Sequence, residues 1–373
     1  MTWVFWGAAG LIFYAFVGYA GWLWMRSRWF AKPVERATIT PSISMVMVVR
    51  NEAKVLEGKL QNLLELDYPQ DRSEVVIVSD GSSDGTGDIL ARYARDSRVR
   101  SIVNPEARGK AAGLNDAVAA AKGEIIVFTD ARQKIESDAM RLLVENFADP
   151  TVGCASGELM LGDPDSGEAI KGVGLYWKLE KKIREMESLS GSVVGATGAL
   201  YAARKSLLVN VPADTILDDV YIPMNVARQG MRVIFDPRAN AWDVADQGTE
   251  REFSRKVRTL SGNYQLLQLA PWLLGSENPL RFEFISHKLM RLMVPFALTA
   301  TLVASMVLSH PIYRFALILQ IAFYALSFLV VAQMKRGLLA RMADAAFTFV
   351  VLNMAAVVAF ANFVMGRKAA WDR

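Results

Sequence analysis

The placement of apolar residues constrains the fold of this chain more than any other feature. Residues 1–25 carry no charged side chain, and further apolar runs occupy residues 292–309, 315–334 and 345–365. Runs of about 20 apolar residues are long enough to cross a bilayer. Hydrophobic residues make up 52% of the chain and mean hydropathy is +0.21, more than a soluble protein usually shows. We therefore predict a charged domain, residues 41–250, anchored to a membrane at both ends.

The flanking charges indicate how the first apolar run is used. A cleaved signal peptide has positive charge before its apolar run, but here the first basic residues follow it: Arg26, Arg28, Lys32 and Arg36. We expect a retained anchor over residues 1–25 and a basic linker over 26–40, with the chain cytoplasmic from residue 26 onward. A single cysteine, Cys154, fits a reducing compartment.

The last membrane segments do not follow one charge rule. Three crossings after the charged domain would place the C-terminus outside. Basic residues nevertheless lie both between the last two segments and in the tail, residues 367–373: Arg336, Arg341, Arg367, Lys368 and Arg373. The sequence leaves open which of the three is re-entrant or interfacial. The net charge of +4 is mild and its basic residues gather near the membrane segments, so we expect no nucleic-acid partner.

Within the charged domain, apolar runs alternate with amphipathic stretches. The expected strands are residues 43–49, 75–78, 99–103 and 125–129, and the expected helices are residues 56–66, 88–95 and 110–121. This alternation predicts a parallel sheet flanked by helices. Such sheets bind ligands beyond the carboxyl ends of their strands.

Polar residues follow each expected strand. The first strand is followed by Arg50, Asn51 and Glu52, and the second by the sequence DGSSDGT from residue 80 to residue 86. That Gly-, Ser- and Asp-rich sequence is also what an ordinary surface turn contains. A dinucleotide fold requires G-x-G-x-x-G after the first strand, which this chain lacks. Hydride transfer is therefore not expected.

Four motifs resemble membrane-bound family 2 glycosyltransferases of the bacterial polysaccharide synthase type. They are RNEAKVLEGKLQNLLELDYP, VVIVSDGSSDGT, RGKAAGLNDAVAAAKGEIIVFTDA and TILDDVYIPMNVARQGMRVIF, in that order. The resemblance implies an α/β GT-A fold with a Rossmann-like mixed sheet over residues 41–250 and transmembrane helices at both ends. It also implies a nucleotide-sugar donor, usually a UDP-sugar, and inversion at the anomeric carbon by a hexosyl- or N-acetylhexosaminyltransferase.

The resemblance also implies which residues bind the donor. Asp80 is expected on the uracil, with Arg50, Asn51 and Glu52 lining the same pocket. Cationic donors suit phosphate oxygens, and Arg108 and Lys110 are expected near the nucleotide. Lys110 could instead be a solvated charge at a helix start, although a cation there opposes the helix dipole. Asp130 ends a buried strand, where a ribose or a metal would account for its carboxylate.

The family places its base in ILDDVYIP. Asp218 and Asp219 occupy the positions of the carboxylate pair, and the resemblance implies that the second, Asp219, is the base. Repulsion between adjacent carboxylates also raises one pKa toward working pH. The alternative is a helix N-cap pair. In the family, the region around Gly198 and Ala199 shapes the acceptor pocket, although it could equally be a packed turn.

Residues 253–267 carry an apolar stripe at helical spacing. Because the membrane segments follow, we expect residues 251–285 to contain an interfacial helix and residues 286–366 to hold the membrane segments. The family has Gln-x-x-Arg-Trp in this helix, and Arg255, Arg258 and Thr259 stand at those places. Arg258 can meet the leaving diphosphate, while Thr259 replaces a tryptophan that would stack on sugar. That departure puts processivity in doubt.

The triplet Asp130-Ala131-Arg132 departs from a two-carboxylate metal motif. Mg²⁺ commonly needs only one or two carboxylates besides substrate phosphates, so Asp130 alone is expected to hold Mg²⁺ or Mn²⁺. Arg132 could instead do part of the cation's work, because a guanidinium bridges phosphate oxygens.

The function expected from these features is single sugar addition to a glycan or lipid-linked acceptor at the inner membrane of a bacterium, in exopolysaccharide or cell-envelope synthesis. Two alternatives stay open. One is a processive synthase that also translocates its product, and the other is an inactive nucleotide-sugar-binding partner in an export complex. Membrane lipids are expected partners, while the sequence identifies no protein partner, donor sugar or acceptor.

Overall fold

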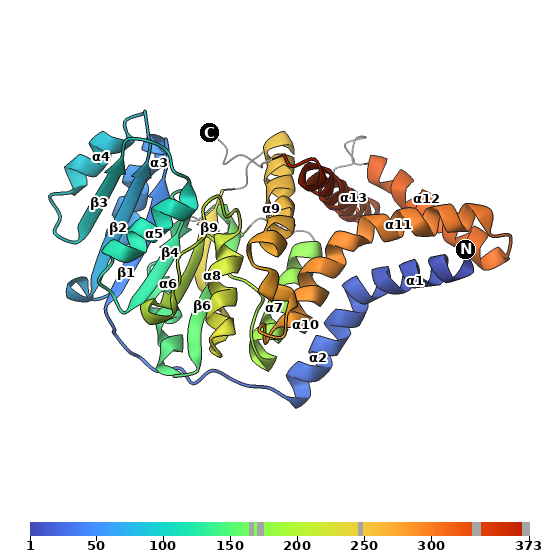
Figure 1. Ribbon diagram of the computed structural model, residues 1–373, viewed down its shortest axis with the longest axis horizontal. Coiled ribbons are helices and arrows are strands. Elements are labelled where there is room, and N and C mark those ends of the chain that lie inside the picture. The colour runs from blue at the N-terminus through green and yellow to red at the C-terminus, as the bar shows by residue number, and fades with distance from the viewer. Residues whose placement is uncertain (164–167, 170–174, 245–248, 330–336, 368–373) are drawn as a thin grey trace.

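The computed structural model describes residues 1–163, 168–169, 175–244, 249–329 and 337–367. It shows a layered α/β region on one side and a group of long helices on the other (Figure 1). Several predicted features lie outside these residues. They are the end of the expected membrane segment at residues 330–334, the charges at Arg336, Lys368 and Arg373, and parts of the expected 41–250 domain and 367–373 tail.

A nine-stranded mixed sheet forms the α/β region. Its strands lie in the order β3-β2-β1-β4-β8-β6-β9-β5, and β7 pairs with β6 off this path. The strands are β1 Ile43–Val49, β2 Ser73–Asp80, β3 Val99–Asn104, β4 Ile125–Thr129, β5 Lys134–Ile135, β6 Val152–Asp163, β7 Glu168–Ala169, β8 Leu200–Arg204 and β9 Arg232–Asp243.

Thirteen α-helices occupy the described ranges. Those of the α/β region are α3 Ala53–Leu64, α4 Thr86–Tyr93, α5 Lys110–Ala120, α6 Ala139–Glu145, α7 Leu175–Ser190 and α8 Asp218–Arg228. The others are α1 Thr2–Phe13, α2 Tyr19–Trp29, α9 Thr249–Leu269, α10 Arg281–Phe284, α11 Met290–Val307, α12 Pro311–Phe328 and α13 Leu338–Val364. Two single π-helical turns, η1 Tyr14–Gly18 and η6 Ile285–Leu289, interrupt α1–α2 and α10–α11. Short 3₁₀ turns occupy Gln70–Arg72, Asn146–Ala148, Lys205–Leu207 and Pro271–Leu274.

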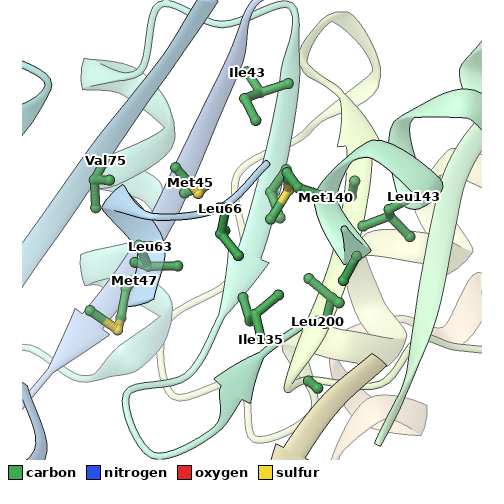
Figure 2. Close-up of a cluster of buried hydrophobic side chains, with 14 of the residues drawn as sticks. Ile43, Met45, Met47, Leu63, Leu66, Val75, Ile135, Met140, Leu143 and Leu200 are labelled. Carbon is green, nitrogen blue, oxygen red and sulfur yellow. The ribbon is translucent and has the colours of Figure 1, made fainter. Parts of the chain in front are cut away.

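Both faces of the sheet are covered because its central strands are apolar throughout. Every residue of β1 is buried, and its side chains alternate between the two faces with the period of two that a strand imposes. Met45 and Met47 pack with α3 and α6 in one core cluster, part of which Figure 2 shows. Val46 and Val48 pack with α5 and α8 in the other.

The first half of the sheet confirms the sequence prediction. β1 pairs in parallel with β2 and β4, and β2 pairs in parallel with β3. The second half is different, because β8 runs antiparallel to both β4 and β6. The parallel sheet predicted from the alternation over residues 43–129 is therefore correct for β1 to β4, and the mixed sheet implied by the family resemblance is correct for the whole region.

Among the described residues, four helices are long and apolar enough to cross a membrane, as expected. They span Thr2–Trp29, Arg281–Val307, Pro311–Phe328 and Leu338–Val364. The first packs along α11 and α12, where the rings of Phe5 and Tyr313 meet edge to face at 4.8 Å. The side of the membrane on which each end lies stays a prediction.

The N-terminal helix is also joined to the α/β region. Tyr19 and Leu23 of α2 are buried against Ile183 and Met186 of α7. The Tyr19 hydroxyl donates a hydrogen bond of 2.6 Å to Glu187 of α7. The first membrane helix is thus a packed part of the structure.

Gly81, which follows β2, gives a test of how the sheet edge is held. Its φ is +64°, and a Cβ there would lie 2.5 Å from the Ala107 nitrogen. Gly230 has a φ of +84° with nothing within 4 Å of the same Cβ position. Left-handed backbone costs a non-glycine residue about 1–2 kcal/mol. We expect Gly230→Ala to lower the free energy of unfolding by about that amount and Gly81→Ala to lower it by more, measured by thermal unfolding in detergent. Equal decreases in the two variants would show that the backbone around Gly81 shifts without cost to accept the added Cβ.

Candidate active site

The carboxyl ends of β1 and β2 are tied together by one side chain. Asn51 adopts a left-handed φ of 54°, which asparagine tolerates better than most residues. Its side-chain oxygen accepts a 2.8 Å hydrogen bond from the Ser83 N–H, and its own N–H donates to the Ser82 hydroxyl at 3.1 Å. Asp84 accepts from the N–H groups of Thr86 and Ala53. The DGSSDGT sequence is therefore a turn held by Asn51 and by its own Asp84.

Asp80 holds the next turn of this edge. Its side chain is fully buried, and its two oxygens accept hydrogen bonds from the Arg108 N–H at 2.8 Å and the Gly109 N–H at 2.9 Å. Asp80 thereby fixes the residues that open α5. Contact between Asp80 and a nucleotide base stays a prediction, since both oxygens already bind backbone.

Lys110 connects three elements at this edge. It opens α5, and its ammonium lies 3.0 Å from Asp130 Oδ1, after β4, and 3.3 Å from Asp218 Oδ1, at the start of α8. Burial lowers the pKa of Lys110, but the charges of Asp130 and Asp218 outweigh burial and raise this pKa above its ordinary value. The lysine stays charged and holds the two carboxylates together, so the reading of Lys110 as a solvated charge is wrong.

Asp218 and Asp219 are the first two residues of α8. The N-cap position belongs to Leu217, and no side chain caps the helix, so the reading of the pair as N-caps is wrong. Burial and then the neighbouring Asp218 charge raise the pKa of Asp219 to about 6, against the opposing charges of Lys110 and Lys288. Burial also raises the pKa of Asp218, although Lys110 counteracts it. A carboxylate near pKa 6 is suited to accept a proton at neutral pH.

Gly198 lies where these carboxylates converge. A Cβ added to it would stand 3.3 Å from Asp219 Oδ2 and 3.8 Å from Asp130 Oδ2. The space between the two carboxylates thus borders a residue with no side chain. Ala199 is different, because it is buried in the core and its carbonyl accepts a 2.9 Å hydrogen bond from Thr129. Acceptor contacts of either residue stay predictions.

Arg184 of α7 supports the Gly198 loop, although sequence reasoning did not single it out. It donates to the Thr197 hydroxyl at 2.6 Å and to the Ser156 hydroxyl at 2.8 Å. Ser156 in turn accepts from the Thr197 N–H at 2.9 Å. In the sequence, Arg184 sits in the charged run KLEKKIRE and has no distinguishing pattern.

Lys59 is a second residue that sequence reasoning missed. It is buried in α3 and donates to the Thr129 hydroxyl at 2.9 Å and to the Gln133 carbonyl at 2.7 Å. Burial lowers the pKa of Lys59 to about 7, against the charge of Asp130. It therefore fixes the chain on both sides of Asp130.

The remaining predicted donor-site residues lie along the same edge. Arg132 is 62% exposed at its side chain and lies 3.9 Å from Glu52. Burial raises the pKa of Glu52, although Arg132 opposes this. Arg50 has a buried Nε with no hydrogen-bond partner among the described residues. Arg108 pairs with Asp116 beside α5. None of these contacts prevents an arginine from also meeting a phosphate.

Helix α9 lies against the segment that leads into the carboxylate pair. A Cβ on Gly262 would come within 2.6 Å of Leu217, so α9 can approach only because this residue is glycine. Gln265 accepts a 2.9 Å hydrogen bond from the Ile216 N–H and donates one of 2.8 Å to the Asp214 carbonyl. Arg255 is exposed and Arg258 half-buried on the preceding turns of α9. Their contact with a leaving diphosphate stays a prediction.

A metal at this site would rest on few protein ligands. Among the described residues, no group of three or more His, Cys, Asp or Glu side chains is arranged to hold an ion. Lys110 takes Oδ1 of Asp130, which leaves Oδ2 and a side chain that is 41% exposed. One such carboxylate fits a cation whose other ligands are phosphates and water.

Residues 44–211 match the family model described as glycosyl transferase family 2. The chain carries a family 2 glycosyltransferase domain. The matched residues contain the strands from β1 to β8 except Ile43, together with the turns and the Gly198 loop described above. Helix α8, with the carboxylate pair, and strand β9 lie beyond them.

Curated relatives include poly-beta-1,6-N-acetyl-D-glucosamine synthases. The protein from Staphylococcus aureus strain COL is 26% identical over 229 residues, which is 60% of this chain and 55% of the relative. The protein from Staphylococcus epidermidis is 25% identical over 252 residues, 65% of this chain and 61% of the relative. The chain thus spans little more than half the length of the curated relatives it matches.

A solved structure resembles the family 2 chain almost from end to end. It is the mannosyltransferase PcManGT from Pyrobaculum calidifontis in complex with GDP-Man and Mn²⁺. The TM-score is 0.73 at 26% identity, covering 96% of this chain and 98% of that one. The GT-A fold is therefore confirmed.

The crowding at Gly198 yields a test of the site. Gly198→Ala should lower the rate of sugar transfer about tenfold, because a shift of a fraction of an ångström in a reacting group is costly. Gly58→Ala in α3 is the control, since nothing lies within 4 Å of its added Cβ. Transfer of radiolabelled sugar by purified protein measures both. A normal rate in Gly198→Ala would place the reaction away from the Asp130 and Asp219 carboxylates.

Proposed function

We propose that this enzyme transfers a sugar from a nucleotide diphosphate sugar to a hydroxyl of a glycan or lipid-linked acceptor, with inversion. The proposal rests on the raised pKa of Asp219 beside the group formed by Lys110, Asp130 and Asp218. The Asp219 carboxylate can thereby accept a proton near neutral pH, while the Lys110 ammonium holds Asp130 and Asp218 in place. An inactive binding partner would need no such base.

The proposed reaction is a single displacement. The acceptor oxygen forms a bond to the anomeric carbon while its proton passes to Asp219. The bond from that carbon to the donor phosphate breaks, and the nucleoside diphosphate leaves with the electron pair. Arg50, Arg132 and Arg258 are the proposed cationic partners of that diphosphate, since charge-assisted hydrogen bonds suit it.

A divalent cation is the proposed further source of positive charge. Asp130 would hold it through Oδ2, and when bound it would neutralise the departing diphosphate. The related mannosyltransferase was solved with Mn²⁺ and a GDP-sugar. UDP-sugars and GDP-mannose are accordingly the donors to test first.

The proposed setting is the cytoplasmic face of a bacterial membrane, in exopolysaccharide or cell-envelope synthesis. The names of the staphylococcal relatives and the four apolar helices support this setting. The relatives' names also keep processive synthesis as a second candidate. Against it stands Thr259, which cannot stack on a sugar as a tryptophan would.

Asp219→Asn tests the proposed base. We expect loss of transfer by at least about a hundredfold, as general base catalysis typically contributes, with nucleotide binding retained. Asp71→Asn, whose side chain is 84% exposed, is the charge-matched control. Because the base acts when ionised, the wild-type rate should fall to about a tenth from pH 8 to pH 5 around a pKa near 6. Unchanged turnover in Asp219→Asn would remove this residue as the base.

Chelation tests the proposed metal. We expect EDTA to abolish transfer, and Mg²⁺ or Mn²⁺ to restore it, because a single carboxylate holds the ion weakly. Asp130→Glu and Arg132→Ala are compared in the same assay, and the metal proposal requires Asp130→Glu to be the more damaging. Survival of activity in EDTA, with Arg132→Ala the worse variant, would assign the charge to Arg132 instead.

A further inference from the structure

Two cavities meet at one cluster of charged side chains behind the catalytic pair. The first, of about 110 Å³, is lined by residues that include Glu180, Arg184 and Glu187 of α7 and by Gly195 and Ala196. The Ala196 N–H donates a 2.7 Å hydrogen bond to the backbone carbonyl of Asp219. This cavity, the catalytic-side cavity, therefore adjoins the proposed base.

The second cavity, of about 180 Å³, lies among the membrane helices. Its apolar lining consists of Phe16, Leu260, Leu292, Phe349, Leu352 and Ala356. These residues come from η1, α9, α11 and α13, and Figure 1 shows α9, α11 and α13 side by side. We call it the membrane-side cavity. Of these four elements, η1, α11 and α13 belong to helices long enough to span a bilayer.

Glu180, His287 and Lys288 line both cavities and so form the wall between them. His287 lies between two carboxylates, 2.8 Å from Glu180 through Nε2 and 2.8 Å from Glu187 through Nδ1. Glu180 also binds Arg291 at 2.5 Å. Burial alone would raise the pKa of Glu180, but His287 and Arg291 hold that pKa well below its usual value.

Lys288 differs from Glu180 and His287, the other two residues of this wall, in its contacts. Its charge acts on Glu180 and on Asp219, yet its ammonium forms no hydrogen bond or ion pair with any residue that the structure describes. An anion bound at this wall would therefore pair with Lys288.

From the arrangement of the two cavities on either side of this charged wall, we infer that they together hold an acceptor made of a sugar, a phosphate group and an apolar chain. The sugar lies in the catalytic-side cavity, the phosphate at Lys288 and the start of the chain in the membrane-side cavity. A neutral glycan would leave Lys288 without a partner. The inference rests on the proposed function and names its acceptor class as a lipid-phosphate-linked sugar.

The polar residues of the membrane-side cavity favour a different ligand from an apolar chain. Thr259, Asn263 and Asn353 also line it, and the side-chain oxygen of Asn263 is buried with no hydrogen-bond partner among the described residues. A glycan chain would use such groups, so an oligosaccharide serves as the rival in the experiment.

The test uses full-length protein in detergent and a photoreactive prenyl diphosphate whose crosslinks are mapped by mass spectrometry. We expect crosslinks in η1, α9, α11 and α13, displaced by farnesyl diphosphate but not by a chitooligosaccharide. Lys288→Gln should weaken probe affinity about tenfold or more, as loss of a charge-assisted contact would, and Lys288→Arg should restore part of it. Lys182→Gln, on an exposed side chain of α7, is the control.

A second variant tests the chain end independently of charge. Leu352→Trp fills the membrane-side cavity and should abolish these crosslinks, whereas Leu319→Trp on the exposed face of α12 should leave them unchanged. Thermal unfolding confirms that each variant is folded. Crosslinks that persist in Leu352→Trp, or that only the oligosaccharide displaces, would overturn the inference.

Donor hydrolysis without acceptor separates this inference from the proposed function. If the enzyme hydrolyses its donor and extends oligosaccharides into a ladder, but does not glycosylate a prenyl-diphosphate-linked sugar, the acceptor assignment is wrong and the proposed function stands. If neither hydrolysis nor transfer occurs with any nucleotide sugar, the proposed function itself is wrong.

Discussion

The arrangement of the site depends on one half-buried ammonium. Lys110 contacts Asp130 and Asp218, and these residues come from the start of α5, the end of β4 and the start of α8. Three neighbouring carboxylates without a cation among them would repel one another and favour protonation. The lysine keeps two of them together, and the third, Asp219, retains a raised pKa. A cation at the start of α5 opposes the helix dipole, and the two carboxylates offset that cost.

The parallel half of the sheet could be predicted from sequence because its strands are short, continuous apolar runs separated by turn residues. β1 and β4 occupy the predicted residues, 43–49 and 125–129. β6 and β9 escaped prediction because local pattern fails there. β6 contains Gly153 and Gly157, and β9 contains Pro237. Their pairing with each other and with β8 is what makes strands of them, and such long-range contacts leave no local period.

The residues of the candidate site also fall into those that a sequence motif indicates and those that only the structure reveals. Asp130, Asp218 and Asp219 could be named because motifs carry them, and Lys110 could be placed beside them. The contacts that orient these residues could not be named. Arg184, Lys59 and Gln265 act on backbone or hydroxyl groups more than ten residues away in sequence. A motif identified Asp80 but did not predict its contacts, because the hydrogen bonds that it accepts from the Arg108 and Gly109 backbone form only in the folded turn.

The close approach at Gly262 bears on how the reaction and the membrane are joined. Gly262 touches Leu217, next to the carboxylate pair, while Tyr264 stacks on Phe363 of α13 at 5.3 Å. These two residues are separated by about 3 Å along the axis of α9. The same turn of α9 therefore packs against both the segment that leads into the carboxylate pair and the last membrane helix, so the site and the membrane helices are coupled through packed side chains.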